Sequence, residues 1–126
     1  MNVFNLPRIL CSLLFVLLAG SSCDRASKPP APLPLDQLPA ALEKAFSKSE
    51  PDTRDLVGSI AASVRSQDYP KAYLGLQTLV GKSKLSREQG DVTARGMLTV
   101  NEALQEAEAK GDAVAAQTLQ NLRRDK

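Results

Sequence analysis

Residues 86–111 read SREQGDVTARGMLTVNEALQEAEAKG and form the longest stretch of helical periodicity in the chain. Ser86, with Gln89 three residues later, is typical of the capping box that starts a helix, and Gly111 follows the last periodic residue. We therefore predict a helix over residues 86–110, with Glu102 on its polar side and the other helices packed on its apolar side. That apolar side spans an arc of about 140° and comprises Val92, Gly96, Met97, Val100, Ala103, Leu104 and Ala107, with Val100 and Leu104 near its centre.

Shorter helices are predicted on both sides of this stretch, over residues 40–47, 51–66 and 69–82 and again after Asp112. Pro51 suits a first helical turn, and Asp68 and Asp112 are favourable N-caps. The apolar residues of each segment recur at helical spacing, and Val80 belongs to the stripe of the third segment. The sequence thus predicts an all-α fold, a small bundle of antiparallel helical hairpins with four or five helices.

Two of the corners between these helices are alike. Asp68 and Asp112 lie 44 residues apart, and each is followed four residues later by alanine, at Ala72 and Ala116. Residues 68–72, DYPKA, resemble the mid-repeat turn of a tetratricopeptide repeat, in which a small alanine lets the second helix pack close to the first. The resemblance implies stacked helical hairpins and covers about a third of the chain after residue 22. In the helix that precedes this turn, Ser59, Ile60 and Ser63 stand where the family's pattern has leucine, glycine and tyrosine.

The N-terminal stretch predicts export. Residues 9–19, ILCSLLFVLLA, form an apolar block of about eleven residues preceded by Arg8, which suits a secretory signal peptide and is too short for a membrane span of ~20 residues. Residues 20–23, GSSC, resemble the bacterial lipobox, although Gly20 stands where that family usually has leucine. The resemblance implies removal of residues 1–22 and attachment of a diacylglycerol thioether to Cys23. Secretion without lipid after a cut behind Ser21, or an uncleaved anchor, are the alternatives.

Cysteine usage favours the lipid. Of the two cysteines, Cys11 lies in the segment to be removed, which leaves Cys23 without a disulfide partner in an oxidising compartment. Asp24 resembles the signal that retains enterobacterial lipoproteins in the inner membrane. We expect a location in the bacterial cell envelope, lipid-anchored to a membrane, with the domain facing the periplasm or the exterior.

Residues 23–39 hold five of the eight prolines and predict a spacer between the anchor and the helical domain of residues 40–126. Proline disfavours helix interiors and central strands, so this linker should be extended polyproline II. At ~3.1 Å per residue, about fifteen extended residues would hold the domain up to ~45 Å from the bilayer. The alternative is a ligand for a proline-binding domain, because Pro29 and Pro32 form a PxxP pattern.

Catalytic chemistry is not indicated. Arg8 is the single charged residue in the segment to be removed, so the rest of the chain has a net charge of about +1. It also has no His and no Trp. Nucleic acid, metal and cofactor sites are therefore not predicted. Residues 75–83, GLQTLVGKS, resemble a phosphate-binding loop with one residue too many between the glycines, and a helix face is the better interpretation. The carboxylate pairs Asp52 with Asp55 and Glu102 with Glu106 are expected to be solvated, with Glu106 paired to Lys110.

These inferences predict a non-catalytic, membrane-anchored lipoprotein that presents a helical protein-interaction or structural domain. Its partners would be the membrane, through the N-terminal lipid, and another envelope protein. A binding module should expose an apolar or aromatic patch, for which Tyr69 and Tyr73 are the candidates; packing at a helix junction is the alternative for both. The other functions considered are a small-ligand carrier and a plain secreted helical protein.

Overall fold

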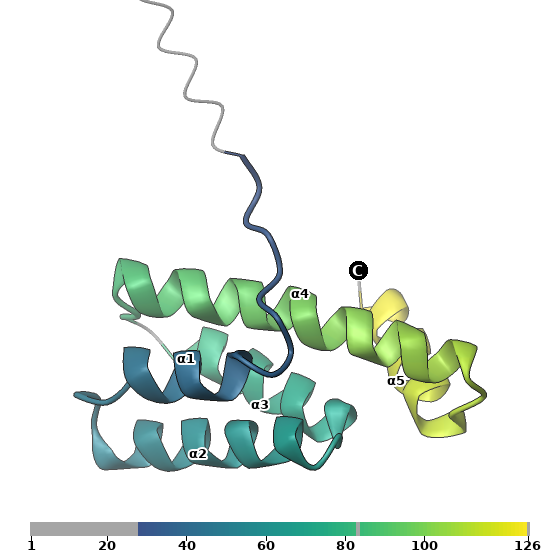
Figure 1. Ribbon diagram of the computed structural model, residues 1–126, viewed down its shortest axis with the longest axis horizontal. Helices are drawn as coiled ribbons and strands as arrows, with labels where there is room; N and C mark the ends of the chain where they lie inside the picture. The colour runs from purple at the N-terminus through teal and green to yellow at the C-terminus, as the bar shows by residue number, and fades with distance from the viewer. Residues whose placement is uncertain (1–27, 83, 126) are drawn as a thin grey trace, which may run out of the picture.

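A computed structural model describes residues 28–82 and 84–125 of the 126-residue chain, and in these residues the fold is all-α (Figure 1). The prediction of a small helical bundle is confirmed. Each helix begins and ends within about two residues of its expected bounds. The five helices are α1 (Leu38–Ala45), α2 (Pro51–Arg65), α3 (Tyr69–Gly81), α4 (Arg87–Ala109) and α5 (Ala113–Arg124).

Local signals fix the ends of the helices. Ser86 and Gln89 form both halves of the capping box at the start of α4. Pro51 occupies the first turn of α2, and so does Pro39 in α1, which begins at Leu38 rather than at the expected residue 40. A proline in the first turn loses no helical hydrogen bond, since the first N–H groups have no partner within the helix.

The two Asp corners share one backbone geometry. Gln67 and Gly111 both adopt a left-handed conformation, with φ of 61° and 92°. The N–H of Asp68 then donates to the carbonyl of Ser63 at 2.8 Å, and the N–H of Asp112 donates to that of Ala107 at 3.0 Å. This pattern closes one helix while each Asp carboxylate caps the next. The sharp turns make α2–α3 and α4–α5 antiparallel hairpins.

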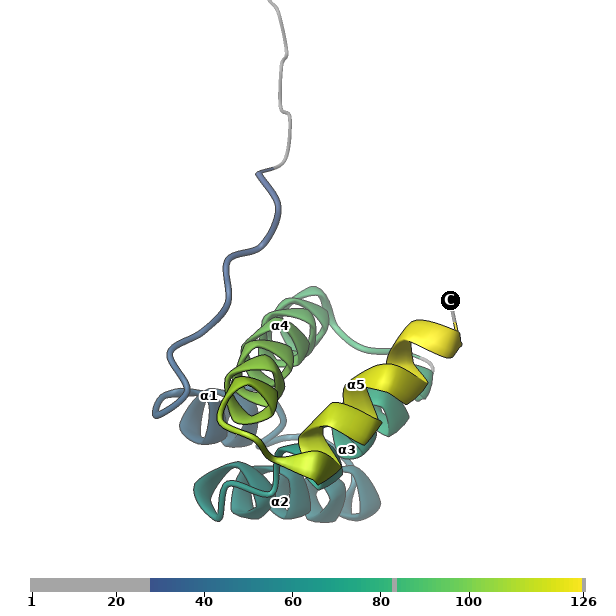
Figure 2. The same cartoon turned by 90° about the vertical axis from the view of Figure 1, so that its right-hand side faces the viewer.

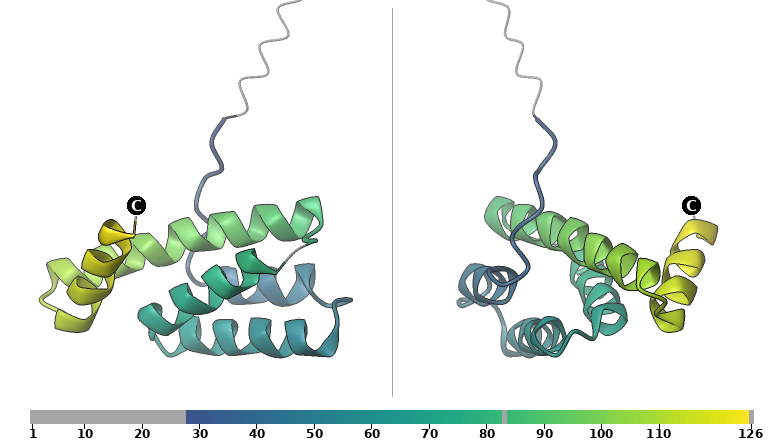
Figure 3. Two further views of the ribbon diagram at one scale, coloured as in Figure 1. Left: turned by 180° about the vertical axis from the view of Figure 1, so that it is seen from behind. Right: turned by 45° about the vertical axis from the view of Figure 1, so that its right-hand side comes forward.

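Helices α1 to α4 surround one core. Seen along the helices, they stand at the corners of a square, and each packs against its two neighbours around the ring (Figure 2). Helix α5 turns back from the end of α4 at a steep angle and also contacts α3 (Figure 3). The expectation that all other helices pack on the longest one is therefore wrong for α2, which lies diagonally opposite α4.

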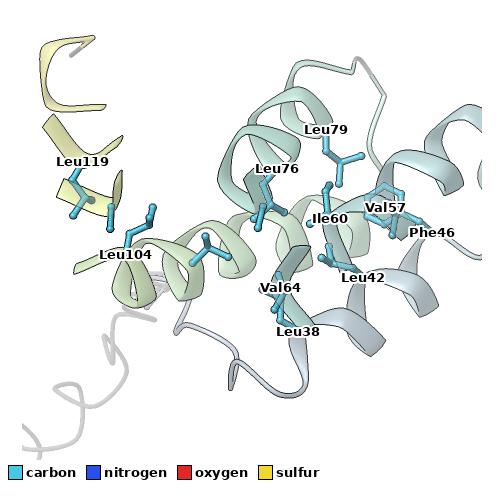
Figure 4. Close-up of a cluster of buried hydrophobic side chains, with 13 residues drawn as sticks. Leu38, Leu42, Phe46, Val57, Ile60, Val64, Leu76, Leu79, Leu104 and Leu119 are labelled. Carbon is cyan, nitrogen blue, oxygen red and sulfur yellow. The ribbon is translucent and has the colours of Figure 1, made fainter. Parts of the chain in front are cut away.

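The core is aliphatic, with one phenylalanine (Figure 4). Val100 and Leu104 are fully buried and Glu102 is exposed, which confirms the predicted inner and outer faces of α4. Leu104 lies beside Leu119 of α5 at one end of this cluster. The buried apolar side chains are Leu38, Leu42, Phe46, Val57, Ile60, Val64, Ala72, Leu76, Leu79, Val100, Leu104, Ala115 and Leu119.

Glycine lets two helix pairs approach closely. A Cβ at Gly75 of α3 would lie 2.5 Å from Cγ1 of Ile60, and a Cβ at Gly96 of α4 would lie 2.9 Å from a methyl group of Leu38. Neither distance is compatible with an unshifted neighbour. Gly96 was expected on the apolar side of its helix, and the structure shows that its lack of a side chain accommodates α1.

Three positions differ from the predicted pattern. Val80 is 52% exposed, although it was expected in the buried stripe of α3. Thr93 and Thr99 are buried on α4, where only apolar residues were expected. The Thr93 hydroxyl donates to the carbonyl of Gln89 at 2.7 Å, so this polar group stays satisfied inside the bundle.

Candidate interaction surfaces

The predicted lipid-attachment residue, Cys23, lies outside the residues that the structure describes. The acidic residues weighed as catalytic pairs are within them, and all four are exposed: Asp52 and Asp55 on α2, Glu102 and Glu106 on α4. The expected pair of Glu106 with Lys110 is not among the ion pairs of the described residues. These carboxylates form part of a solvated surface.

The glycines of the phosphate-loop-like stretch lie in α3. Gly75 stands within the helix where Ile60 approaches, and Gly81 is its last residue. The N–H of Lys82 donates to the carbonyl of Leu79 at 3.2 Å. Helix packing therefore accounts for Gly75, and the N–H of Lys82 is bonded within the last turn of α3, while Ser83 lies outside the described residues.

The two tyrosines do not form a single exposed patch. Tyr69 and Tyr73 are both half-buried and pack against the hydrophobic core, as the alternative of junction packing predicts. They also line different hollows. Tyr69 borders one between α1 and the start of α3, whereas Tyr73 borders one between α3, α4 and α5.

The second of these hollows, which we call the three-helix groove, has a volume of about 300 Å³. Its walls carry carboxamides at Gln77, Asn101 and Gln105, and its apolar part is supplied by two leucines of α5. Charged groups stand only at the end of α5. The complete lining is Tyr73, Gln77, Asn101, Gln105, Leu119, Leu122, Arg123 and Asp125.

The best-defined contact surface is occupied by the chain itself. Residues 28–34 have no helix or strand and run as an extended strap across α4 (Figure 1). The Nε of Arg95 donates to the carbonyl of Ala31 at 2.8 Å. The hydroxyl of Thr99 lies 2.7 Å from the carbonyl of Leu33 and 3.0 Å from that of Arg95. A hydroxyl has one hydrogen, which we assign to the shorter contact.

The spacing of these two bonds follows from backbone geometry. Residues two apart in a fully extended chain lie on the same side and are separated by ~6.6 Å, and residues four apart on an α-helix are separated by ~6.0 Å. Donors at positions 95 and 99 therefore match carbonyls at positions 31 and 33. Leu33 and Leu35 pack their side chains against the core beneath the strap.

The strap was missed because the prolines were interpreted as a spacer, or as a ligand for a separate proline-binding domain, and not as a segment packed on the chain's own helices. A signal was present in the sequence: Leu33 and Leu35 alternate with Pro32 and Pro34. A solvated spacer needs no leucines, whereas an extended chain that lies on a core places every second side chain on the same side. The first turn of α1 then follows, with the N–H of Leu38 donating to the carbonyl of Pro34 at 3.1 Å.

Electrostatic contacts are peripheral. Arg65 of α2 donates to both carboxylate oxygens of Glu43 on α1, at 3.0 and 3.2 Å, and this hydrogen bonding raises the pKa of the guanidinium above its ordinary value. Both side chains are exposed, so the pair adds little to stability. Arg95 lies 3.7 Å from Asp91 one turn earlier, which orients its side chain beside the strap.

Comparison with known proteins identifies no relative. No protein-family model, no curated protein and no solved structure matches the chain. Across residues 28–82 and 84–125, no group of three or more metal-ligating side chains is found. In the same residues no helix has the length and apolar character needed to cross a membrane.

Proposed function

We propose that the chain is a non-catalytic bacterial envelope lipoprotein, anchored through a lipid on Cys23, whose helical domain binds another envelope protein. The observation that carries this proposal is the strap. The extended segment that enters the first helix is held by Arg95 and Thr99 on a folded domain, through the carbonyls of Ala31 and Leu33. Such an arrangement suits a domain that is displayed from an anchor.

The three-helix groove is the surface that we assign to the partner. It lies on the flank of α4 away from the strap, so the chain's own tether leaves it uncovered. Carboxamides at Gln77, Asn101 and Gln105 can each donate and accept, which suits a polypeptide backbone. Leu122, which is half-buried, supplies an apolar contact beside them, and apolar contacts are typical of the centres of protein interfaces.

The lining of the groove favours a protein partner over a small ligand. A carrier encloses most of its ligand within a pocket. Such pockets are lined mainly by apolar side chains, whereas polar or charged side chains make up five of the eight in the groove: Gln77, Asn101, Gln105, Arg123 and Asp125. The space enclosed by the four helices α1, α2, α3 and α4 is, in contrast, filled by the side chains of the core.

Site-specific photocrosslinking in the native membrane tests this function. A photoreactive amino acid at Asn101 in the groove is expected to yield a crosslinked envelope protein, and one at Asp55 on the exposed face of α2 is not. The same cells should lose the crosslink when residues 1–23 are replaced by a signal peptide that is cleaved without lipid attachment. Equal crosslinking from positions 55 and 101, or crosslinking that is unaffected by this replacement, would contradict the proposal.

A further inference from the structure

The strap is bonded to α4, and its leucine side chains pack against the core. Its carbonyls at Ala31 and Leu33 accept from Arg95 and Thr99, and Thr99 is only 5% exposed. The chain then turns, with the N–H of Gln37 donating to the carbonyl of Pro34 at 3.0 Å, and enters α1. Contacts therefore hold the tether from residue 31 onward, several residues before the first helix.

We propose that Arg95 and Thr99 act as a clamp that fixes both the reach and the orientation of the anchored domain. This inference rests on the proposed function, because it concerns a tether that ends at a lipid on Cys23. The clamp makes the segment of residues 31–37 part of the domain and leaves only residues 23–30 as spacer.

The clamp shortens the reach by about half. Eight residues of extended chain, 23–30, span at most ~25 Å, whereas the fifteen residues 23–37 would span ~47 Å. The clamped domain therefore stays close to the bilayer. Release of Ala31 and Leu33 from α4 would let it move outward by up to ~20 Å.

The clamp also selects which face of the domain can meet a partner. The strap leaves the domain beside α4 and on the side of α1, and α2 is on the opposite side of the bundle (Figures 1 and 2). The three-helix groove lies on the other flank of α4, lined by Asn101 and Gln105. A tether held at Arg95 and Thr99 keeps this groove beside the anchor with its opening unobstructed by the strap.

The test compares an unclamped variant with its matched controls. Arg95→Met/Thr99→Val removes both donors and nearly preserves side-chain size. Thr99→Ser, with Arg95 intact, keeps a hydroxyl that can donate to the carbonyl of Leu33, so this variant should keep the clamp. Thr118→Val controls for the loss of a threonine hydroxyl, since Thr118 donates only to the carbonyl of Val114 in its own helix, at 2.8 Å.

The first readout needs no membrane. Methyl NMR of the detergent-solubilised full-length protein should show dispersed shifts for Leu33 and Leu35 in the wild type, in Thr99→Ser and in Thr118→Val. In the double variant these two residues should move to random-coil shifts while the core methyl groups of Leu76 and Leu104 keep theirs. Unchanged Leu33 and Leu35 shifts in the double variant would overturn the clamp whether or not the protein is lipidated.

The second readout measures the reach in lipid bilayers. A donor dye on Ala109→Cys and acceptor dyes on the lipid headgroups report the height of the domain by energy transfer, because a thioether at Cys23 cannot take the dye. The double variant should transfer less than the wild type, by a lengthening of up to ~20 Å. Equal energy transfer in the wild type and the double variant would overturn the clamp. Failure of the wild-type protein to join the bilayer would instead overturn the anchored function, and the NMR result would then decide the clamp.

Discussion

Leu104→Ala tests how α4 and α5 are held together. Leu104 is fully buried next to Leu119, and its helix continues for only five more residues before the corner at Gly111. Truncating a buried leucine to alanine costs about 2–5 kcal/mol, because apolar contacts are lost and a cavity remains. A domain of this size has on the order of 5–13 kcal/mol of stability in total, so the loss is a large share.

The expected shift in melting temperature follows from this loss. Each kcal/mol lowers the melting temperature of a small domain by roughly 4–8 °C, so Leu104→Ala should melt on the order of 10–30 °C below the wild type. Glu102→Ala is the matched control on the same helix. Its side chain is exposed and outside the ion pairs described, so its cost should stay under about 0.5 kcal/mol.

Thermal melts followed by circular dichroism measure both variants, and light scattering reports their association. If the apolar side of α4 served a second chain instead of the bundle, Leu104→Ala would reduce the scattering mass and leave the melting temperature unchanged. That result, or equal melting temperatures for Leu104→Ala and Glu102→Ala, would refute the assigned inner face of the helix.

Three further substitutions probe separate contacts. Gly96→Ala should destabilise by about 1–3 kcal/mol in chemical denaturation, because the new methyl group meets Leu38 at 2.9 Å; an unchanged midpoint would contradict the close packing. Gln89→Ala should cost about 1–3 kcal/mol, since its side chain bonds three groups at the start of α4 and the end of α1; a cost below that of an ordinary surface substitution would argue against this link. Glu43→Gln should change stability by less than about 1 kcal/mol, because its ion pair with Arg65 is exposed, and a larger effect would show that the pair is not merely peripheral.

The helices were predictable because their signals are local. Pro51, Asp68, Ser86 and Gly111 each act on the nearest turn of the chain, and the apolar residues between them repeat with the helical period. Such signals specify where a helix begins and which of its faces is buried. For this reason the burial of Leu104 followed from the sequence alone.

Contacts between distant segments were harder to predict. Thr99 is polar, so a search for apolar periodicity assigns it to the surface, and its burial depends on a carbonyl 66 residues earlier in the chain. Val80 has the right period but lies at the border of its stripe, where packing by a neighbouring helix decides its exposure. The square arrangement, with α2 and α4 at opposite corners, likewise depends on how four helices share one core.

The groove illustrates a second limit. Tyr73 was a candidate aromatic contact for a partner, yet Gln77, Asn101 and Gln105 were not candidates, because carboxamides on a helix surface are common. Only the position of α5 brings them together with Leu119 into one hollow. The composition of a site of this kind becomes visible once the tertiary fold is known.

The chemical state of the mature N-terminus tests the central claim most directly. Intact-mass and peptide mass spectrometry of the protein purified from membranes should show a chain that begins at Cys23 and carries the added mass of a diacylglycerol. The Cys23→Ala variant should accumulate as the full-length precursor. An N-terminus at Ser22 without any lipid mass would contradict the anchored function.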